Sequence, residues 1–306
     1  MTTFTARSLV ARPEVDPTNG DTVDRVSPPT WQPLTVAEAL ARKGALRIAV
    51  CLPARNEEGT VGSIVGTIRD ELMGAGGLVD ELIVIDDGST DATASVAIDA
   101  GARVVPNAAR CHGKGAALWT SVQATDADLI VWCDADLLEF TGTYVLGLVT
   151  PLLSDPSVVF VKGAFERPVD GDDVGGRVTE LVARPLLHVL HPGVAHIDQP
   201  LGGEYAGRRT VLAQLPFVVG YGVEMGLLLD VAYRYGTDAI AQVELGTRHH
   251  RRRKLLALEP QALEVLLVAL DRAGIAVPDT IALNRRGEKL GSVGLQTLPP
   301  PEGTAK

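Results

Sequence analysis

Between residues 46 and 165, short apolar runs alternate with amphipathic stretches. The runs predict strands at residues 47–52, 81–85, 103–105, 129–133 and 158–161, and the stretches predict helices at residues 60–73, 91–100, 114–124 and 144–153. Strands that alternate with helices indicate βαβ units around a mainly parallel sheet. Near-continuous runs such as LIVI and LIVW are typical of strands covered on both faces. We therefore predict an α/β fold, with a Rossmann-like, mainly parallel sheet flanked by helices.

The rest of the chain is less regular. Residues 1–45 are rich in proline and polar residues and predict a flexible N-terminal arm with one short helix at 35–43. After the first half, 46–165, a second and smaller half covers 166–285. Helices are predicted there at 178–190, 223–235 and 260–273, and a strand at 240–245. The prolines and glycines that follow predict a loose end, with a flexible tail at 286–306.

Composition excludes several classes of protein. The 306 residues are 46% apolar, which is enough for a sizeable core. A net charge of −10 argues against a general nucleic-acid binder, which needs a basic face. No apolar stretch approaches the roughly 18 residues that span a bilayer, and residues 1–17 lack the apolar core of a signal peptide. We therefore expect a cytoplasmic protein with no nucleic-acid or membrane partner. Its cysteines, Cys51, Cys111 and Cys133, form no CxxC pair and are interpreted as free thiols, two of them buried.

Polar residues follow three of the predicted strands. They read PARNEE after 47–52, DDGSTD after 81–85 and DAD after 129–133. Ligands of open α/β sheets bind beyond these carboxyl ends. Helix capping by Asn56 and by Ser89 or Thr90 is a sufficient alternative for the first two segments. Capping does not explain Asp134 and Asp136, because neighbouring carboxylates repel and the strand does not need them.

The spacing of the two aspartates suggests a cation. Residues i and i+2 of an extended chain point to the same side, and paired carboxylates suit a hard ion such as Mg²⁺ or Mn²⁺, which in turn binds phosphates. Lys114 lies between two glycines at a predicted helix start and is a candidate phosphate contact. A solvated lysine is the alternative. The sequence has no GxGxxG after the first strand and no complete P-loop motif.

Longer segments carry a specific resemblance. They are PARNEEGTVGSIV, VDELIVIDDGSTDAT, GKGAALW, DAD, GGRVTELVARPLL, QPLGGEYAGRR, GYGVEMGLLLD and AIAQVELGTRHHRRR, in this order between residues 47 and 253. Together they resemble the GT-A glycosyltransferases and, within these, the retaining glucosyl-3-phosphoglycerate synthases of actinobacteria. The resemblance implies a GT-A fold, transfer of α-glucose from UDP-glucose to D-3-phosphoglycerate, Mg²⁺ or Mn²⁺ as the cofactor, and a homodimer.

The resemblance also implies roles for individual residues. The catalytic residues would be Glu224, Lys114 and Asp136. The donor would be bound by Pro53, Ala54, Arg55, Glu57, Ser89, Lys114, Asp134, Tyr221 and Arg248. The acceptor would be bound by Gly176, Arg177, Thr179 and Arg252, and the metal by Asp136 and His250.

Elementary chemistry agrees with these roles. Arg177 stands at the start of a predicted helix, where free N–H groups and a guanidinium suit an anionic acceptor. The basic run 248–254 would add positive charge, although a solvated basic loop is the alternative. Arg252 stands where the family has asparagine, so another small anionic acceptor or another donor sugar remains a second interpretation.

Glu224 has two interpretations. No second carboxylate is recognisable as a nucleophile, which favours attack on the same face from which the diphosphate leaves, with Glu224 positioning hydroxyls. A glutamate that only stabilises a helix start is the alternative. The remaining candidates are interpreted as structural: His188, His191, His196, Trp119 and Trp132.

Two other classes of function remain at this point. A sugar-phosphate nucleotidylyltransferase would usually carry a glycine- and arginine-rich loop after its first strand, whereas PARNEEG is acidic. A non-catalytic nucleotide-sugar sensor would need no acceptor pocket. UDP release in the presence of UDP-glucose, Mg²⁺ and acceptors separates all three.

Overall fold

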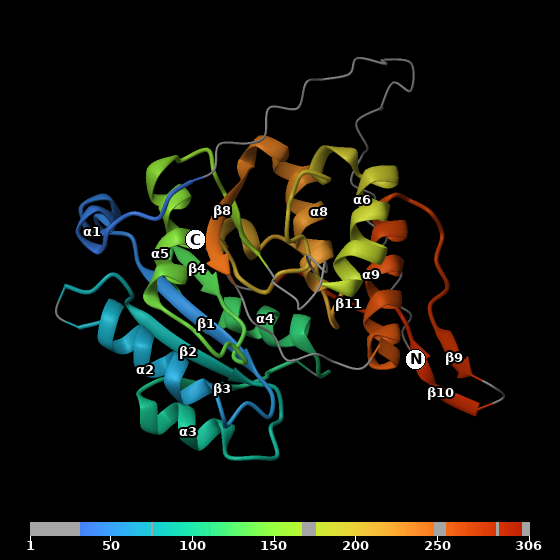
Figure 1. Cartoon of the computed structure of the whole chain (residues 1–306), viewed down its shortest axis with the longest axis horizontal. Coiled ribbons are helices and arrows are strands. Elements are labelled where there is room, and N and C mark those ends of the chain that lie inside the picture. Colours follow the sequence, from blue (N-terminus) through green and yellow to red (C-terminus); the bar gives the residue numbers. More distant parts are fainter. Residues whose placement is uncertain are drawn as a thin grey trace.

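A seven-stranded sheet forms the centre of the computed structural model, which describes residues 31–74, 76–109, 111–166, 176–247, 255–285 and 288–301 (Figure 1). The strands lie in the order β3-β2-β1-β4-β6-β5-β8. Their bounds are β1 (Ile48–Ala54), β2 (Glu81–Asp86), β3 (Arg103–Pro106), β4 (Leu129–Trp132), β5 (Phe160–Glu166), β6 (Tyr205–Arg208) and β8 (Ile240–Thr247). Only β6 runs antiparallel to its neighbours, β4 and β5. The predicted mainly parallel α/β fold is therefore confirmed.

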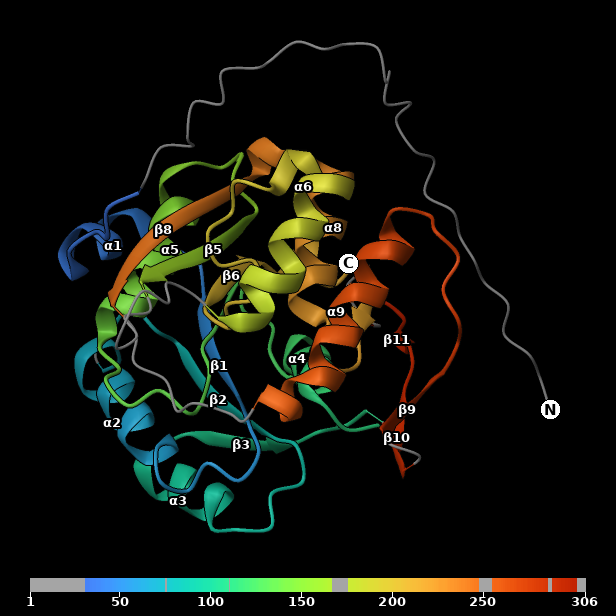
Figure 2. The ribbon, with the colours of Figure 1, turned by 45° about the vertical axis from the view of Figure 1, so that its right-hand side comes forward.

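Helices cover both faces of this sheet. One face packs against α1 (Val36–Lys43), α2 (Val61–Leu72), α3 (Thr93–Ala100) and α5 (Gly142–Ser154). The other packs against α4 (Lys114–Gln123), α6 (Arg184–Leu190), α8 (Val223–Tyr235) and α9 (Glu259–Arg272), and Figure 2 shows the last three side by side. Alternate residues of β1 enter the two cores: Val50 enters the first, and Ala49 and Cys51 the second. Burial on both faces is why the strands read as continuous apolar runs.

Each predicted helix and strand has a counterpart, but some ends differ. β1 continues to Ala54, so Pro53 and Ala54 are its last residues and do not follow it. Pro53 pairs with Ile85 of β2, whereas pairing with β4 ends at Cys51. A proline is tolerated here because the strand has a neighbour on one side only.

The helix predicted at 178–190 consists of two parts. It begins with a π-helical turn, η1 (Thr179–Ala183), and continues as α6. Such turns inside helices occur frequently at functional sites.

Several short elements were not predicted. They are β6, α7 (Arg209–Leu212), β7 (Phe217–Val218), β9 (Ile281–Arg285), β10 (Glu288–Val293) and β11 (Thr297–Leu298). Where a loose end was expected after α9, the structure has a β9–β10 hairpin and a strand, β11, that pairs with β7. The Trp119 indole N–H donates to the carbonyl of Pro299 at 2.7 Å, which fixes the chain beyond β11 against α4.

The interpretation of Trp132 and the cysteines as structural is confirmed. Trp132 is buried and its indole N–H donates to Ser121 Oγ at 2.8 Å. All three cysteines are free, and Cys51 and Cys133 are buried. Burial raises the pKa of the Cys51 thiol to about 12, so it is inert as a nucleophile.

Among the residues that the structure describes, none of the helices combines the length and the apolar character that a bilayer crossing requires.

Candidate active site

Lys114, Asp134 and Glu224 meet at the carboxyl end of the sheet. Lys114 is the first residue of α4, Asp134 follows β4, and Glu224 lies in the first turn of α8. Lys114 Nζ lies 2.6 Å from Asp134 Oδ1 and 2.6 Å from Glu224 Oε1. Glu224 is only 3% exposed. The structure thus brings together three residues that were predicted from separate segments.

The two carboxylates determine the charge of Lys114. Burial favours the neutral amine, but Asp134 and Glu224 outweigh it and raise the pKa of Lys114 well above its ordinary value. Lys114 is therefore an ammonium at any physiological pH. An ammonium has three donors, and after facing two carboxylates it can still offer a hydrogen bond to a ligand oxygen.

The glycines beside Lys114 are needed for close backbone packing. A β-carbon at Gly115 would lie 1.7 Å from the carbonyl oxygen of Val218, and one at Gly113 would lie 2.8 Å from that of Val219. The Ala116 N–H donates to the same Val219 oxygen at 3.2 Å. Residues 218–222, which lead into α8, are called here the α8 entry turn. The glycines let the start of α4 lie directly against this turn, which sets the distance between Lys114 and Glu224.

Glu264 of α9 holds the α8 entry turn from the other side. The Tyr221 N–H donates to Glu264 Oε2 at 2.5 Å, and a β-carbon at Gly220 would lie 2.3 Å from that oxygen. Burial raises the pKa of Glu264, whereas the N–H groups of Tyr221 and Gly222 act against this shift. Tyr221 itself is 42% exposed, as a residue at the mouth of a binding site would be.

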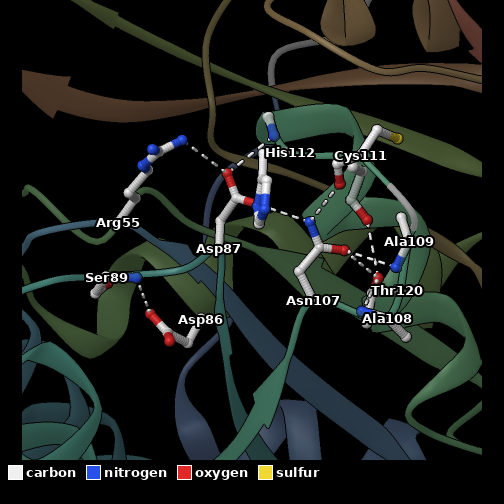
Figure 3. A network of polar contacts seen from close by, with 12 residues as sticks. Arg55, Asp86, Asp87, Ser89, Asn107, Ala108, Ala109, Cys111, His112 and Thr120 are labelled. Carbon is white, nitrogen blue, oxygen red and sulfur yellow. Dashed lines mark hydrogen bonds and ion pairs between the residues drawn. The ribbon is translucent and has the colours of Figure 1, made fainter.

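Asp87 fixes the loop that precedes Lys114 (Figure 3). Its buried carboxylate accepts hydrogen bonds from the Gly113 N–H at 2.9 Å and from Asn107 Nδ2 at 2.6 Å. His112 Nδ1 lies 3.0 Å away and must donate, because a carboxylate only accepts. Arg55 adds an ion pair at 3.8 Å. Asp87 therefore connects the end of β2 to the start of α4.

The loops after β1 and β2 bind each other rather than capping helices. The Asn56 N–H donates to Ser89 Oγ at 3.0 Å, and Asn56 Oδ1 accepts from the Thr90 N–H at 2.8 Å. The Glu57 N–H donates to Thr93 Oγ1 at 2.8 Å. Asn56 has a φ of 59°, which asparagine tolerates better than most residues. The joined loops carry Arg55, Glu57 and Ser89, three of the predicted donor-binding residues.

The capping alternative for these loops is wrong. The N-cap residue of α2 is Thr60 and that of α3 is Ala92, neither of which was predicted. The Thr60 hydroxyl instead donates to the carbonyl of Ala135 at 2.7 Å. It thereby anchors the segment that carries Asp134 and Asp136.

Asp134 and Asp136 have different surroundings. Asp134 faces Lys114 and packs on Gly203, where a β-carbon would lie 2.2 Å from its Oδ1. Asp136, a predicted metal ligand, is exposed, whereas Asp134 is partly buried. His250, the other predicted ligand, lies outside the described residues.

The two predicted metal ligands, Asp136 and His250, suit Mg²⁺ or Mn²⁺ only at an open site, where other ligands complete the coordination. Within the described ranges, no three His, Cys, Asp or Glu side chains are grouped closely enough to hold an ion. A carboxylate and an imidazole at such a site leave positions for the phosphates of a substrate, which is how Mg²⁺ is commonly held.

Three of the predicted acceptor-binding residues, Gly176, Arg177 and Thr179, lie in the described part of the chain. Gly176 and Arg177 precede η1, which begins at Thr179. Arg177 is exposed and Thr179 is 3% exposed. Arg248 and Arg252 lie outside the described residues.

Three residues beneath the site had not been singled out: Lys162, Glu204 and Tyr205, all fully buried. Lys162 Nζ donates to the carbonyl of Gly202 at 2.6 Å and lies 4.4 Å from the centre of the Tyr205 ring. A lysine inside the apolar run VVFVKGA is the signal that marks this position in the sequence.

Comparison with known proteins identifies the family. The model of glycosyl transferase family 2 matches residues 49–207. The glucosyl-3-phosphoglycerate synthase of Mycolicibacterium smegmatis is 48% identical over 81% of this chain and 84% of its own length. That of Petrotoga mobilis is 43% identical over 76% and 75%. The chain belongs to the glucosyl-3-phosphoglycerate synthases.

Solved structures of this synthase family extend the likeness to the fold. The Mycobacterium tuberculosis glucosyl-3-phosphoglycerate synthase, crystallised with Mn²⁺, UDP-glucose and phosphoglyceric acid, superposes with a TM-score of 0.81 at 43% identity, over 89% of this chain and 96% of that one. Its complex with Mn²⁺, UDP and glucosyl-3-phosphoglycerate also gives 0.81 at 43% identity, over 89% and 97%. The GT-A fold is thereby confirmed, and the chain is a hexosyltransferase.

Proposed function

We propose that this synthase transfers α-glucose from UDP-glucose to a hydroxyl of D-3-phosphoglycerate, giving glucosyl-3-phosphoglycerate and UDP. One observation carries the proposal: Lys114 lies 2.6 Å from both Asp134 and Glu224 at the carboxyl end of the sheet. The relatives support it, because a related enzyme has been crystallised with UDP-glucose and phosphoglyceric acid, and also with UDP and glucosyl-3-phosphoglycerate.

On the donor side, the nucleoside is bound by Pro53 and Ala54 at the end of β1. The joined loops after β1 and β2 add Arg55, Glu57 and Ser89. Asp134 binds the donor, and Tyr221 and Arg248 line the same cleft. Asp136, in the Asp-x-Asp segment, and His250 would hold Mg²⁺ or Mn²⁺, which when bound neutralises charge on the diphosphate.

In the transfer step, the bond between glucose C1 and the diphosphate oxygen breaks while the acceptor hydroxyl oxygen bonds to C1 from the same face. The hydroxyl proton passes to the departing diphosphate oxygen. Lys114 stabilises the negative charge that grows on that oxygen, a contribution that needs a cation already in place. Glu224 positions hydroxyls of the substrates, so donor and product are both α-linked.

On the acceptor side, Gly176, Arg177 and Thr179 bind the phosphate or carboxylate at the start of η1, and Arg252 assists. The exposed guanidinium of Arg177 beside a helix start supports this role. Because Arg252 replaces the asparagine of the family, a different small anionic acceptor is the second candidate.

At the level of the whole chain, residues 46–165 form the donor-binding half and 166–285 the acceptor-binding half. The enzyme acts as a homodimer in the cytoplasm.

The proposal is tested by incubating the full chain with UDP-glucose, Mg²⁺ and a panel of small phosphorylated or carboxylated acceptors. UDP release and the mass of the product are measured. We expect 3-phosphoglycerate to be the preferred acceptor. Turnover with none of the panel, or preference for an uncharged acceptor, would contradict the proposal.

Stereochemistry tests the transfer step. NMR coupling at the anomeric carbon should report an α-linked product. Glu224→Gln keeps shape and hydrogen bonding and should slow turnover without abolishing it. A β-linked product, with complete loss of activity in Glu224→Gln, would make Glu224 a general base and overturn the same-face mechanism.

A further inference from the structure

Lys162 is a buried cation directly under the proposed catalytic cluster. It lies on β5, pairs with Tyr205 of β6 and is 0% exposed. Its ammonium donates to the carbonyl of Gly202 at 2.6 Å and lies over the Tyr205 ring at 4.4 Å. Removing an ammonium from water is costly, and one carbonyl and one ring do not offset that cost. A position of this kind needs carboxylates nearby.

The surrounding elements supply them. Burial lowers the pKa of Lys162 to about 8, and the Glu224 carboxylate is the strongest influence in the opposite direction. The charged and titratable groups that face Lys162 are Glu224 of α8, Lys114 of α4, Asp134 after β4, Glu204 before β6, and Tyr205 of β6. Two cations, Lys114 and Lys162, therefore interact with the carboxylates of Glu224, Asp134 and Glu204.

Lys162 is also mechanically connected to Asp134. Its ammonium holds the carbonyl of Gly202, and the next residue, Gly203, packs directly on the Asp134 carboxylate. The N–H of Gly163 donates to the carbonyl of Glu204 at 2.9 Å, which fixes the other end of the same segment to β5. A displacement at Lys162 would thus reach Asp134 through one short segment.

We propose that Lys162 is a positioning residue for glucosyl transfer: its ammonium holds the Gly202–Gly203 segment against Asp134, so that this carboxylate keeps its place beside Lys114. This inference rests on the proposed function. Lys162 itself contacts neither substrate, because it is fully buried.

The test compares two buried lysines in the full chain. Lys162→Met removes the ammonium and keeps the length of the side chain. Lys43→Met is the matched control, because Lys43 is 8% exposed and pairs with Asp80 at 2.8 Å on α1, outside the site. The melting temperature, kcat, the KM for UDP-glucose and the Kd for UDP are measured for each.

We expect Lys162→Met to lower kcat roughly ten- to a hundredfold, as small displacements of catalytic groups do. The Kd for UDP should change less than about threefold, because separate sites couple weakly. Lys43→Met should lower the melting temperature and leave kcat unchanged. A merely structural role would give both variants the same pattern.

The pH profile supplies a second readout. As pH rises through about 8, Lys162 loses its charge, so the kcat of the wild type should decline. Lys162→Arg should remain active and move this decline to higher pH, since guanidinium stays charged. In Lys162→Met the decline should be absent.

A Lys162→Met variant with wild-type kcat and an unchanged alkaline decline would overturn the inference. If that variant does not fold, Lys162→Arg decides: a folded arginine variant with a wild-type melting temperature and an unmoved decline overturns it equally. A wild type inactive toward 3-phosphoglycerate would count against the proposed function instead, and hydrolysis of UDP-glucose would then supply the rate for the same comparison.

Discussion

Among single residues, the glycines of the site matter because they have no side chain. A β-carbon at Gly203 would come within 2.2 Å of Asp134 Oδ1, closer than any non-bonded contact allows. Charged residues such as Asp134 and Lys114 can be predicted from the sequence, because the residue type alone shows their chemistry. Gly203 cannot be predicted in this way, since the need for glycine follows from the position of a neighbour, Asp134, in the folded chain.

Gly203→Ala should therefore lower kcat by roughly tenfold or more, because Asp134 must move away from Lys114. Gly66→Ala in α2 is the control, as nothing lies within 4 Å of a β-carbon there. That control should keep its activity and raise the melting temperature slightly, since alanine favours helix. Steady-state kinetics and thermal unfolding of both variants check this, and unchanged kcat in Gly203→Ala would contradict it.

Asp136 gives the prediction for metal removal. Asp136→Ala should lose metal-dependent turnover and keep its fold, because a carboxylate after a strand contributes little packing. Added EDTA should abolish turnover in the wild type. Circular dichroism and UDP release with and without Mn²⁺ are the measurements. Full activity in EDTA, or in the variant, would contradict the assignment of Asp136 to the metal.

At the scale of elements, the start of η1 and α6 is where the acceptor is expected. Arg177→Ala should raise the KM for the acceptor about ten- to a hundredfold, because a hydrogen bond to a charged group is worth roughly 1.5–3 kcal/mol. Arg184→Ala serves as the comparison, since Arg184 pairs with Glu180 at 3.1 Å within the same helical segment. An equal rise in the KM for UDP-glucose would contradict the assignment of Arg177 to the acceptor site.

His191 joins three helices and confers a pH dependence on stability. Its Nε2 donates to the carbonyl of Ala269 in α9 at 2.9 Å, so its Nδ1 accepts from the Tyr233 hydroxyl of α8. Burial lowers the pKa of His191, whereas the hydrogen bond to Ala269 acts against this shift. The interpretation of His191 as structural is confirmed by these contacts.

Because the folded-state pKa is depressed, the neutral form contributes its full stability above the unfolded pKa of about 6.5. That contribution is lost as pH falls through the folded-state pKa, since the unfolded chain binds a proton first. Urea unfolding between pH 5 and 8 should show the decline, and His191→Gln should show a shallower one. The same slope in both proteins would refute this account.

In the molecule as a whole, a long-range contact joins the segment after α9 to the segment before α8. β11 pairs with β7, Thr297 opposite Val218 and Leu298 opposite Phe217, and the Val219 N–H donates to the carbonyl of Gln296 at 2.9 Å. The tail thus supports the α8 entry turn, on which the start of α4 packs. Periodicity predicted the long parallel strands but not β7 or β11, because a two-residue strand has no period and is defined only by its partner.

A chain shortened to residue 294 should consequently fold around its sheet but lose most of its turnover. Its kcat should fall roughly tenfold or more, because Glu224 and Lys114 lose a common support. A chain shortened to residue 301 keeps β11 and is the control. Near-native kcat in the shorter chain would show that the β7–β11 contact does not matter for catalysis.

The β7–β11 contact also has a consequence for biosynthesis. A ribosome releases the sheet strands long before it releases residues 297–298, and early segments fold first. A nascent or prematurely terminated chain can therefore bury its cores while the turn that orients Glu224 still lacks its partner strand. Catalytic competence would then come after the burial of both cores, so that chains terminated before residue 296 consume UDP-glucose more slowly than longer ones.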